Sequence, residues 1–276
     1  MKLKFLVITL FLVSLTYSQK KEKIKGSKIV TAQIKETENF TTIEIADNFE
    51  VFLVKGEKCS VEIEADDNLH DIIVFDVLAG SLNISTTKEV IKATKFSIRI
   101  NYTDNLKTIT IKDNVKLNAL TDLVLNDVTI KNFDNSSSFL NVKSAKFTIQ
   151  LNDKSNAELN INSENAIIEI SKNAKAKALV NATDFKLDMY QKTDFVIEGE
   201  ALNAQIRLDN NAELTAKKFI VSEMVLTTEG YTKSSINVKN NLKISAIGKS
   251  KIEILGDAKI EIVDFKNNAV LEKIEK

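Results

Sequence analysis

Three side chains spaced 19 residues apart have the chemistry of an acid–base site. Glu169, Asp188 and Arg207 occupy equivalent positions in successive copies of a repeated pattern, with Lys186 and Gln205 nearby. Glycosidases use two carboxyl groups about 5 to 9.5 Å apart, a separation that adjacent repeats can provide. The simpler interpretation is a surface row of ion pairs that offsets the stacking of like charges and needs no function. We favour this second interpretation and keep a carbohydrate-active enzyme as the alternative.

A ladder of apolar residues places these side chains on neighbouring strands. Each copy reads apolar, variable, apolar, which is typical of a short strand, and the copies recur at intervals of 18 to 20 residues. The second apolar residue of each copy is Ile111, Ile130, Ile149, Ile168, Leu187, Ile206, Leu226, Ile244 or Ile262. Such self-similarity predicts a stack of equivalent coils whose apolar columns face inward.

Polar corners separate two or three short strands within each repeat. Examples are Ser171-Lys172-Asn173 and Asp209-Asn210-Asn211, whose residue types tolerate the left-handed backbone of a sharp turn. No helical periodicity is present, and proline is absent from the whole chain. The sequence therefore predicts an all-β protein, a right-handed parallel β-helix or β-solenoid with repeats of about 19 residues.

The pattern divides the chain into four parts. Residues 1–18 have the features of a signal peptide, with two lysines ahead of a short apolar run, and residues 19–39 are predicted to be a flexible leader. Residues 40–105 alternate with less regular spacing, as a small β-domain or an irregular cap over the end of the stack. Residues 106–276 form the repetitive β-helix.

Composition excludes several classes of function. The chain has 38 basic and 38 acidic residues, so there is no electrostatic reason to expect nucleic acid as a partner. No stretch after the signal peptide has the length of a transmembrane helix, and no glycine-rich phosphate loop is present. We therefore expect no cofactor. The lone Cys59 excludes an internal disulfide.

One acidic turn is a weak candidate for a metal site. Asp66, Asp67 and Asp71 could form a carboxylate cup for calcium, but they lack the ligand spacing of an EF-hand loop. His70, in the same segment, is the only histidine, which excludes a multi-histidine metal site. We expect His70 to be a solvated turn residue and the chain to bind no metal.

The order of the early strands resembles a known family. Segments 40–45, 49–56, 61–69 and 80–84, followed by 96–100 and 106–111, resemble the putative auto-transporter adhesin, head GIN domain family. The resemblance covers roughly residues 40 to 260. It implies a secreted or envelope-associated bacterial β-helical protein with a role in adhesion, and it brings no catalytic residues. The chain departs from the family's Gly-Ser-Gly corners, since it carries Asn-Asn, Lys-Asn and Lys-Ser there.

These observations favour a non-catalytic, exported cell-envelope protein that acts as an adhesin or interaction module. Its flat β-faces would bind a protein or a glycan, in the periplasm or on the outer cell surface. The open ends of a stacked solenoid also allow self-association, which light scattering would detect.

Overall fold

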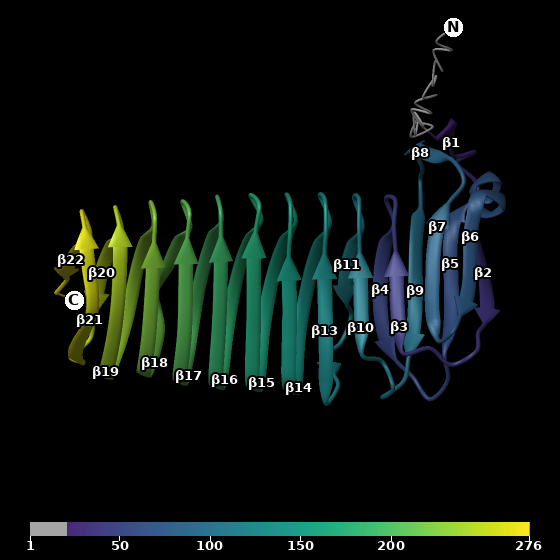
Figure 1. The fold of residues 1–276 in the computed structure, drawn as a ribbon. Helices are drawn as coiled ribbons and strands as arrows, with labels where there is room; N and C mark the ends of the chain where they lie inside the picture. The colour runs from purple at the N-terminus through teal and green to yellow at the C-terminus, as the bar shows by residue number, and fades with distance from the viewer. Residues whose placement is uncertain (1–20, 276) are drawn as a thin grey trace, which may run out of the picture.

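Parallel strands stacked in register make up most of the molecule. The computed structural model describes residues 21–275, so the predicted signal peptide and the first two residues of the predicted leader lie outside the described residues. The described part of the chain is 71% strand and 2% helix, with about nine turns of roughly 19 residues, which confirms the predicted β-solenoid. Figure 1 shows the coils side by side along one axis.

The regular part of the solenoid is built from thirteen strands. They are β10 (Thr108–Ile111), β11 (Lys116–Ala119), β12 (Leu123–Val124), β13 (Asp127–Asn132), β14 (Ser137–Leu151), β15 (Asn156–Ser171), β16 (Lys175–Tyr190), β17 (Asp194–Asp209), β18 (Glu213–Glu229), β19 (Lys233–Gly248), β20 (Lys251–Leu255), β21 (Lys259–Asn267) and β22 (Val270–Lys273).

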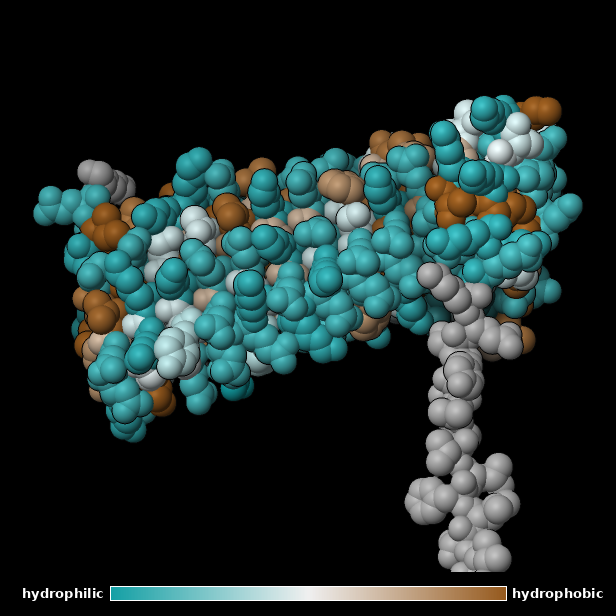
Figure 2. All heavy atoms as spheres, turned by 90° about the horizontal axis from the view of Figure 1, so that it is seen from above, coloured by the Kyte–Doolittle hydropathy of each residue, from teal (hydrophilic) through white to brown (hydrophobic). Residues whose placement is uncertain are grey.

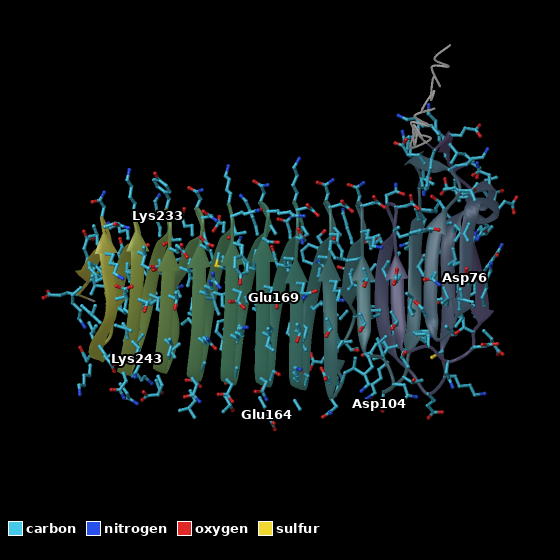
Figure 3. All side chains as sticks on the ribbon, in the orientation of Figure 1. Asp76, Asp104, Glu164, Glu169, Lys233 and Lys243 are labelled. Carbon is cyan, nitrogen blue, oxygen red and sulfur yellow. The ribbon has the colours of Figure 1, made fainter. Side chains whose placement is uncertain are left out.

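Each long strand from β14 to β19 contributes to two faces of the solenoid. In β14, Ser137–Ser144 and Lys146–Leu151 pair with separate stretches of β15, and the pairing is interrupted at Ala145. The equivalent position in β15 is Glu164, which lies at the lower edge of the solenoid in Figure 3. The halves after these bends form one face, which we call the ladder face, because they carry the apolar ladder.

The N-terminal region adds nine strands and one short helix. They are β1 (Lys23–Lys25), β2 (Val30–Glu36), β3 (Thr42–Ile45), β4 (Glu50–Lys55), β5 (Ser60–Asp66), the 3₁₀ helix η1 (Asp67–Ile72), β6 (Ile73–Leu78), β7 (Ser81–Thr86), β8 (Glu89–Lys92) and β9 (Phe96–Tyr102). Strand β3 pairs with β10 on one side and β7 on the other, both in parallel. The solenoid therefore begins with β3 and β4, and the antiparallel strands β2, β5 and β6 cover its end.

The prediction of a flexible leader over residues 19–39 is wrong for its described part. Strand β1 pairs with β8, and all seven residues of β2 pair antiparallel with β5. The apolar pattern of β2 is weak because it is an edge strand whose residues are nearly all exposed. Its backbone hydrogen bonds to β5, which a sequence pattern does not reveal, hold it in place.

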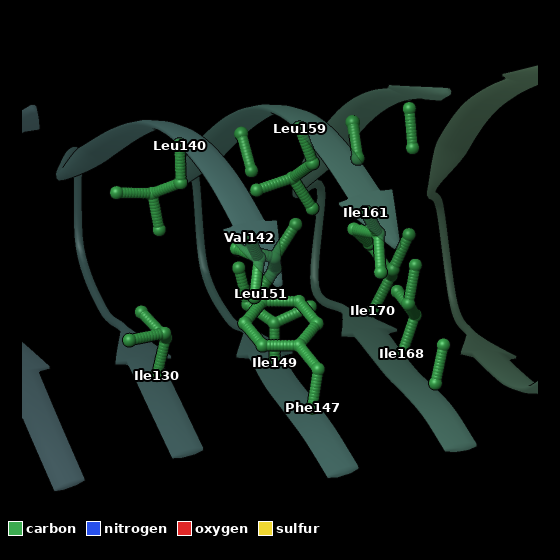
Figure 4. Close-up of a cluster of buried hydrophobic side chains, with 14 of the residues drawn as sticks. Ile130, Leu140, Val142, Phe147, Ile149, Leu151, Leu159, Ile161, Ile168 and Ile170 are labelled. Carbon is green, nitrogen blue, oxygen red and sulfur yellow. The ribbon is translucent and has the colours of Figure 1, made fainter. Parts of the chain in front are cut away.

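The interior consists of apolar columns that run along the axis. Ile130, Ile149 and Ile168 are in register on consecutive coils and are completely buried. Figure 4 shows these isoleucines opposite Leu140 and Leu159 from the other face. Burial of each such side chain stabilises the fold by roughly 1.5 to 3 kcal/mol.

The corners have the left-handed backbone that their residue types predict. Successive coils carry a non-glycine residue with positive φ at this position: Asp113, Asp134, Asp153, Lys172, Gln191 and Asn210. One glycine is needed inside a strand: Gly199 has a φ of 108°, and a Cβ there would lie 2.1 Å from the carbonyl oxygen of Val180. Only glycine permits this approach between β16 and β17.

The last coil differs from the predicted ladder. Ile244 is fully buried, whereas Ile262 on β21 is 54% exposed. Val263 and Phe265 are exposed as well. Within the described residues no further coil covers β21, so its apolar side chains meet solvent. Figure 2 shows hydrophobic surface at this end and also over the N-terminal region, with a largely hydrophilic surface between them.

Candidate functional site

The structure brings Glu169, Asp188 and Arg207 onto neighbouring strands of the ladder face. Glu169 is in register with Asp188, and Asp188 with Arg207, as the 19-residue spacing predicts. The three side chains project outward because each follows an inward residue of the ladder. Figure 3 shows Glu169 in the middle of this face.

Each of the three charged groups is held by a neighbour on the same face. Glu169 accepts a hydrogen bond of 2.9 Å from the side-chain amide of Gln150. Asp188, which is only 8% exposed, lies 3.0 Å from the ammonium group of Lys186. The hydrogen bond to Asp188 raises the pKa of Lys186 above its ordinary value.

An aromatic contact completes this arrangement. The guanidinium of Arg207 lies over the ring of Tyr190, 5.6 Å from its centroid. Burial raises the pKa of Tyr190, and the charge of Asp188 raises it further, whereas Arg207 lowers it. Of these contacts, Asp188–Lys186 is an ion pair, Gln150–Glu169 is a side-chain hydrogen bond, and Arg207 packs on an aromatic ring.

A groove of about 880 Å³ lies beside the row but not on it. It is lined by residues that directly follow the bends of the long strands, including Asp184, Asn203 and Glu223. Lys186 and Gln205, two residues further along, also line it. Glu169, Asp188 and Arg207 are not among its lining residues. A glycosidase would need the two carboxylates to face a bound sugar within such a groove.

Asp66 holds backbone groups instead of forming an open cup. Its fully buried carboxylate accepts hydrogen bonds from the backbone N–H groups of Lys28, Thr94 and Lys95, at 2.9 to 3.2 Å. Burial raises its pKa, but these hydrogen bonds outweigh that effect and leave the pKa below its ordinary value. Donors that point at a carboxylate occupy the positions a cation would take.

The other two carboxylates of this turn, Asp67 and Asp71, differ in their surroundings. Asp67 accepts hydrogen bonds from Ser27 and from the backbone of Asn68, whereas Asp71 is exposed. Among residues 21–275, no group of three His, Cys, Asp or Glu side chains has the arrangement of a metal site. We therefore propose no metal site at Asp66, Asp67 and Asp71.

His70 is not the solvated turn residue expected from the sequence. It is 8% exposed within η1, and its Nε2 lies 3.0 Å from the hydroxyl of Thr31 on β2. The burial of His70 could not be predicted because strand β2, which covers His70, was itself predicted to be part of a flexible leader.

A recess that the sequence did not suggest lies at the corners opposite the bends. Its volume is about 640 Å³, and its walls include Lys192, Asp194, Asn211, Glu213 and Tyr231. We call it the corner recess. Tyr231 is 60% exposed and takes the place that lysine or asparagine has in neighbouring copies. An aromatic residue at an exposed corner was the signal that could have revealed this recess.

The one helix among the described residues is short. η1 has six residues, far short of a bilayer span, and no candidate membrane-spanning helix occurs in the described part of the chain.

Solved structures share the solenoid fold. The putative adhesin of Parabacteroides merdae ATCC 43184 has 19% sequence identity and a TM-score of 0.63, over 92% of this chain and 100% of that one. The putative adhesin of Parabacteroides distasonis ATCC 8503 has 18% identity and a TM-score of 0.65, over 91% and 100%. A putative lipid binding protein of the same strain has 14% identity and a TM-score of 0.61, over 92% and 100%. At these identities the likeness establishes the fold alone.

Sequence comparison identifies the family. No curated protein matches the chain. Residues 39–258, which contain every strand from β3 to β20, match the family described as putative auto-transporter adhesin, head GIN domain. This confirms the resemblance carried by the early strands. The chain belongs to the putative auto-transporter adhesin, head GIN domain family.

Proposed function

We propose that this chain is an exported, non-catalytic binding protein of the bacterial cell envelope, which presents the outer faces of its solenoid to a protein or glycan. The observation that carries the proposal is the row of outward side chains repeated in register along the coils, on a backbone already paired on both sides. Such a surface is rigid and extended, and solenoids commonly use it for binding. Membership of an adhesin family supports the same role.

The charges favour binding over catalysis. Asp188 is paired with Lys186, and Glu169 with Gln150, so both carboxylates are engaged within the protein. Neither lines the adjacent groove. No observation favours the carbohydrate-active alternative.

Export and binding can be tested together. The full chain is expressed in a bacterium and the envelope, periplasm and cytoplasm are separated. We expect the protein in the envelope or periplasm, with an N-terminus at Gln19. The purified mature protein should then bind isolated envelopes saturably. Retention in the cytoplasm with an intact N-terminus would contradict export, and unsaturable or absent envelope binding would contradict the adhesin role.

A further inference from the structure

The corner recess spans four consecutive coils. Each coil supplies a corner residue and a residue at the start of the following strand, and in three coils Ala174, Thr193 or Ala212 lies between them. The corner residues are Asn173, Lys192, Asn211 and Tyr231, and the strand residues are Lys175, Asp194, Glu213 and Lys233. The strand residues are in register with one another, so the recess is a continuous surface on rigid elements. Figure 3 shows Lys233 near the upper corners, at the opposite edge from Lys243.

Tyr231 forms one end of this recess. Its ring is mostly exposed and therefore adds little to the core. The ammonium group of Lys249, from the next coil, lies 5.1 Å from the ring centroid. Lys249 is not among the lining residues of the recess, whereas Asn211 of the preceding coil is.

The polar side chains of the recess are not engaged within the protein. In the described part of the chain, no side-chain hydrogen bond or ion pair involves Asn211, Glu213 or Asp194. The groove on the ladder face differs, since Asn203 donates to Asp184 at 2.9 Å and Asn241 donates to Glu223 at 2.9 Å. Polar groups that contact only water can exchange it for ligand hydroxyls without breaking protein contacts.

Size and backbone pairing favour a small polar ligand over a protein. A recess of about 640 Å³ is within the usual range for small-molecule sites. Strands β16 and β17 are each paired on both sides, so an extended peptide cannot add to the sheet here. The lining has three lysines and two carboxylates, a mixture that does not select strongly for an anion.

We propose that the corner recess binds a carbohydrate, with a sugar ring stacked on Tyr231 and its hydroxyl groups hydrogen-bonded to Asn211 and Glu213. A pyranose has an apolar face and a rim of hydroxyls, which matches one exposed aromatic ring beside amide and carboxylate groups. This inference rests on the proposed function, because it specifies the ligand class of the binding protein.

Binding to soluble oligosaccharides tests the inference. The probes are short oligosaccharides of glucose, mannose, galactose and N-acetylglucosamine, and the readouts are calorimetry and tyrosine fluorescence, which is usable because the chain has no tryptophan. We expect saturable binding of at least one probe. Tyr231→Ala should weaken it about tenfold, the upper end of an aromatic contact. Tyr231→Phe should retain it, and Asn211→Ala should weaken it.

The matched control is Phe139→Ala, which removes another exposed aromatic ring outside the recess and should leave binding unchanged. Unchanged affinity in a folded Tyr231→Ala variant would overturn the inference, as would a folded wild-type protein that binds none of the probes. If that protein still binds isolated envelopes saturably, this inference fails and the proposed function stands. If it binds neither, both fail.

Discussion

At the scale of single residues, side-chain direction decides what a substitution does. Ile167 and Ile168 are neighbours on β15, but Ile168 is completely buried in the interior whereas Ile167 lines the outer groove. We expect Ile168→Asp to prevent folding, because it places an unpaired carboxylate in an apolar column. Ile167→Asp should fold. Soluble yield and thermal melting by circular dichroism measure both, and a cooperatively melting Ile168→Asp protein would contradict the inward placement.

Asp66 should make stability depend on pH. Its pKa is below the ordinary value in the folded protein, so its stabilising effect is present above the unfolded-state pKa and is lost as pH falls through the folded pKa. We expect Asp66→Ala to lower the urea midpoint at neutral pH. The difference from wild type should shrink below about pH 3.9. A difference that stays constant through the acid range would show that the carboxylate's charge is not responsible.

Whether a side chain points inward or outward was predictable from the sequence where the repeat is regular, and less so elsewhere. The alternation of β15 and β16 correctly placed Glu169 and Asp188 in register on an outer face. It did not reveal that Lys186 and Gln150 would engage them, because side-chain pairing depends on rotamers as well as on register. Nor did it reveal the burial of His70 beneath β2.

At the scale of elements, one glycine controls the spacing between two long strands. Gly199→Ala would push its Cβ against the carbonyl of Val180, so we expect separation of β16 and β17 and a marked loss of stability. Gly56→Ala is the control, since the nearest atom to its Cβ would lie at an ordinary distance of 3.4 Å. Urea unfolding compares the two, and equal midpoints would exclude a spacing role for Gly199.

The regular coils could be predicted from the sequence because each buries its own apolar ladder at a constant interval. The cap could not. Strands β2 and β5 are linked by antiparallel hydrogen bonds across a long stretch of chain, and β3 inserts between β7 and β10 although it precedes both. Pairings of this kind leave little trace in local periodicity.

At the scale of the whole molecule, the two ends of the described solenoid are unequal. Antiparallel strands cover the N-terminal end, whereas no described coil stacks on β21 and β22, which pair only with β19 and β20. Because stacked repeats contact only their neighbours, opening should begin at the uncovered coil. We expect backbone amides of β21 and β22 to exchange with deuterium much faster than those of β15 to β17. Uniform protection along the axis would contradict this.

The central claim is that the solenoid binds its ligand without chemical change, and recovery of a bound glycan tests it most directly. Envelope glycans are incubated with the purified protein until binding reaches equilibrium. The bound glycans are then separated from the free ones, and the masses of both fractions are measured by mass spectrometry. We predict saturable binding and unaltered glycan masses, with the same result for Glu169→Gln and Asp188→Asn. Shortened glycans produced by the wild-type protein but not by these two variants would contradict it.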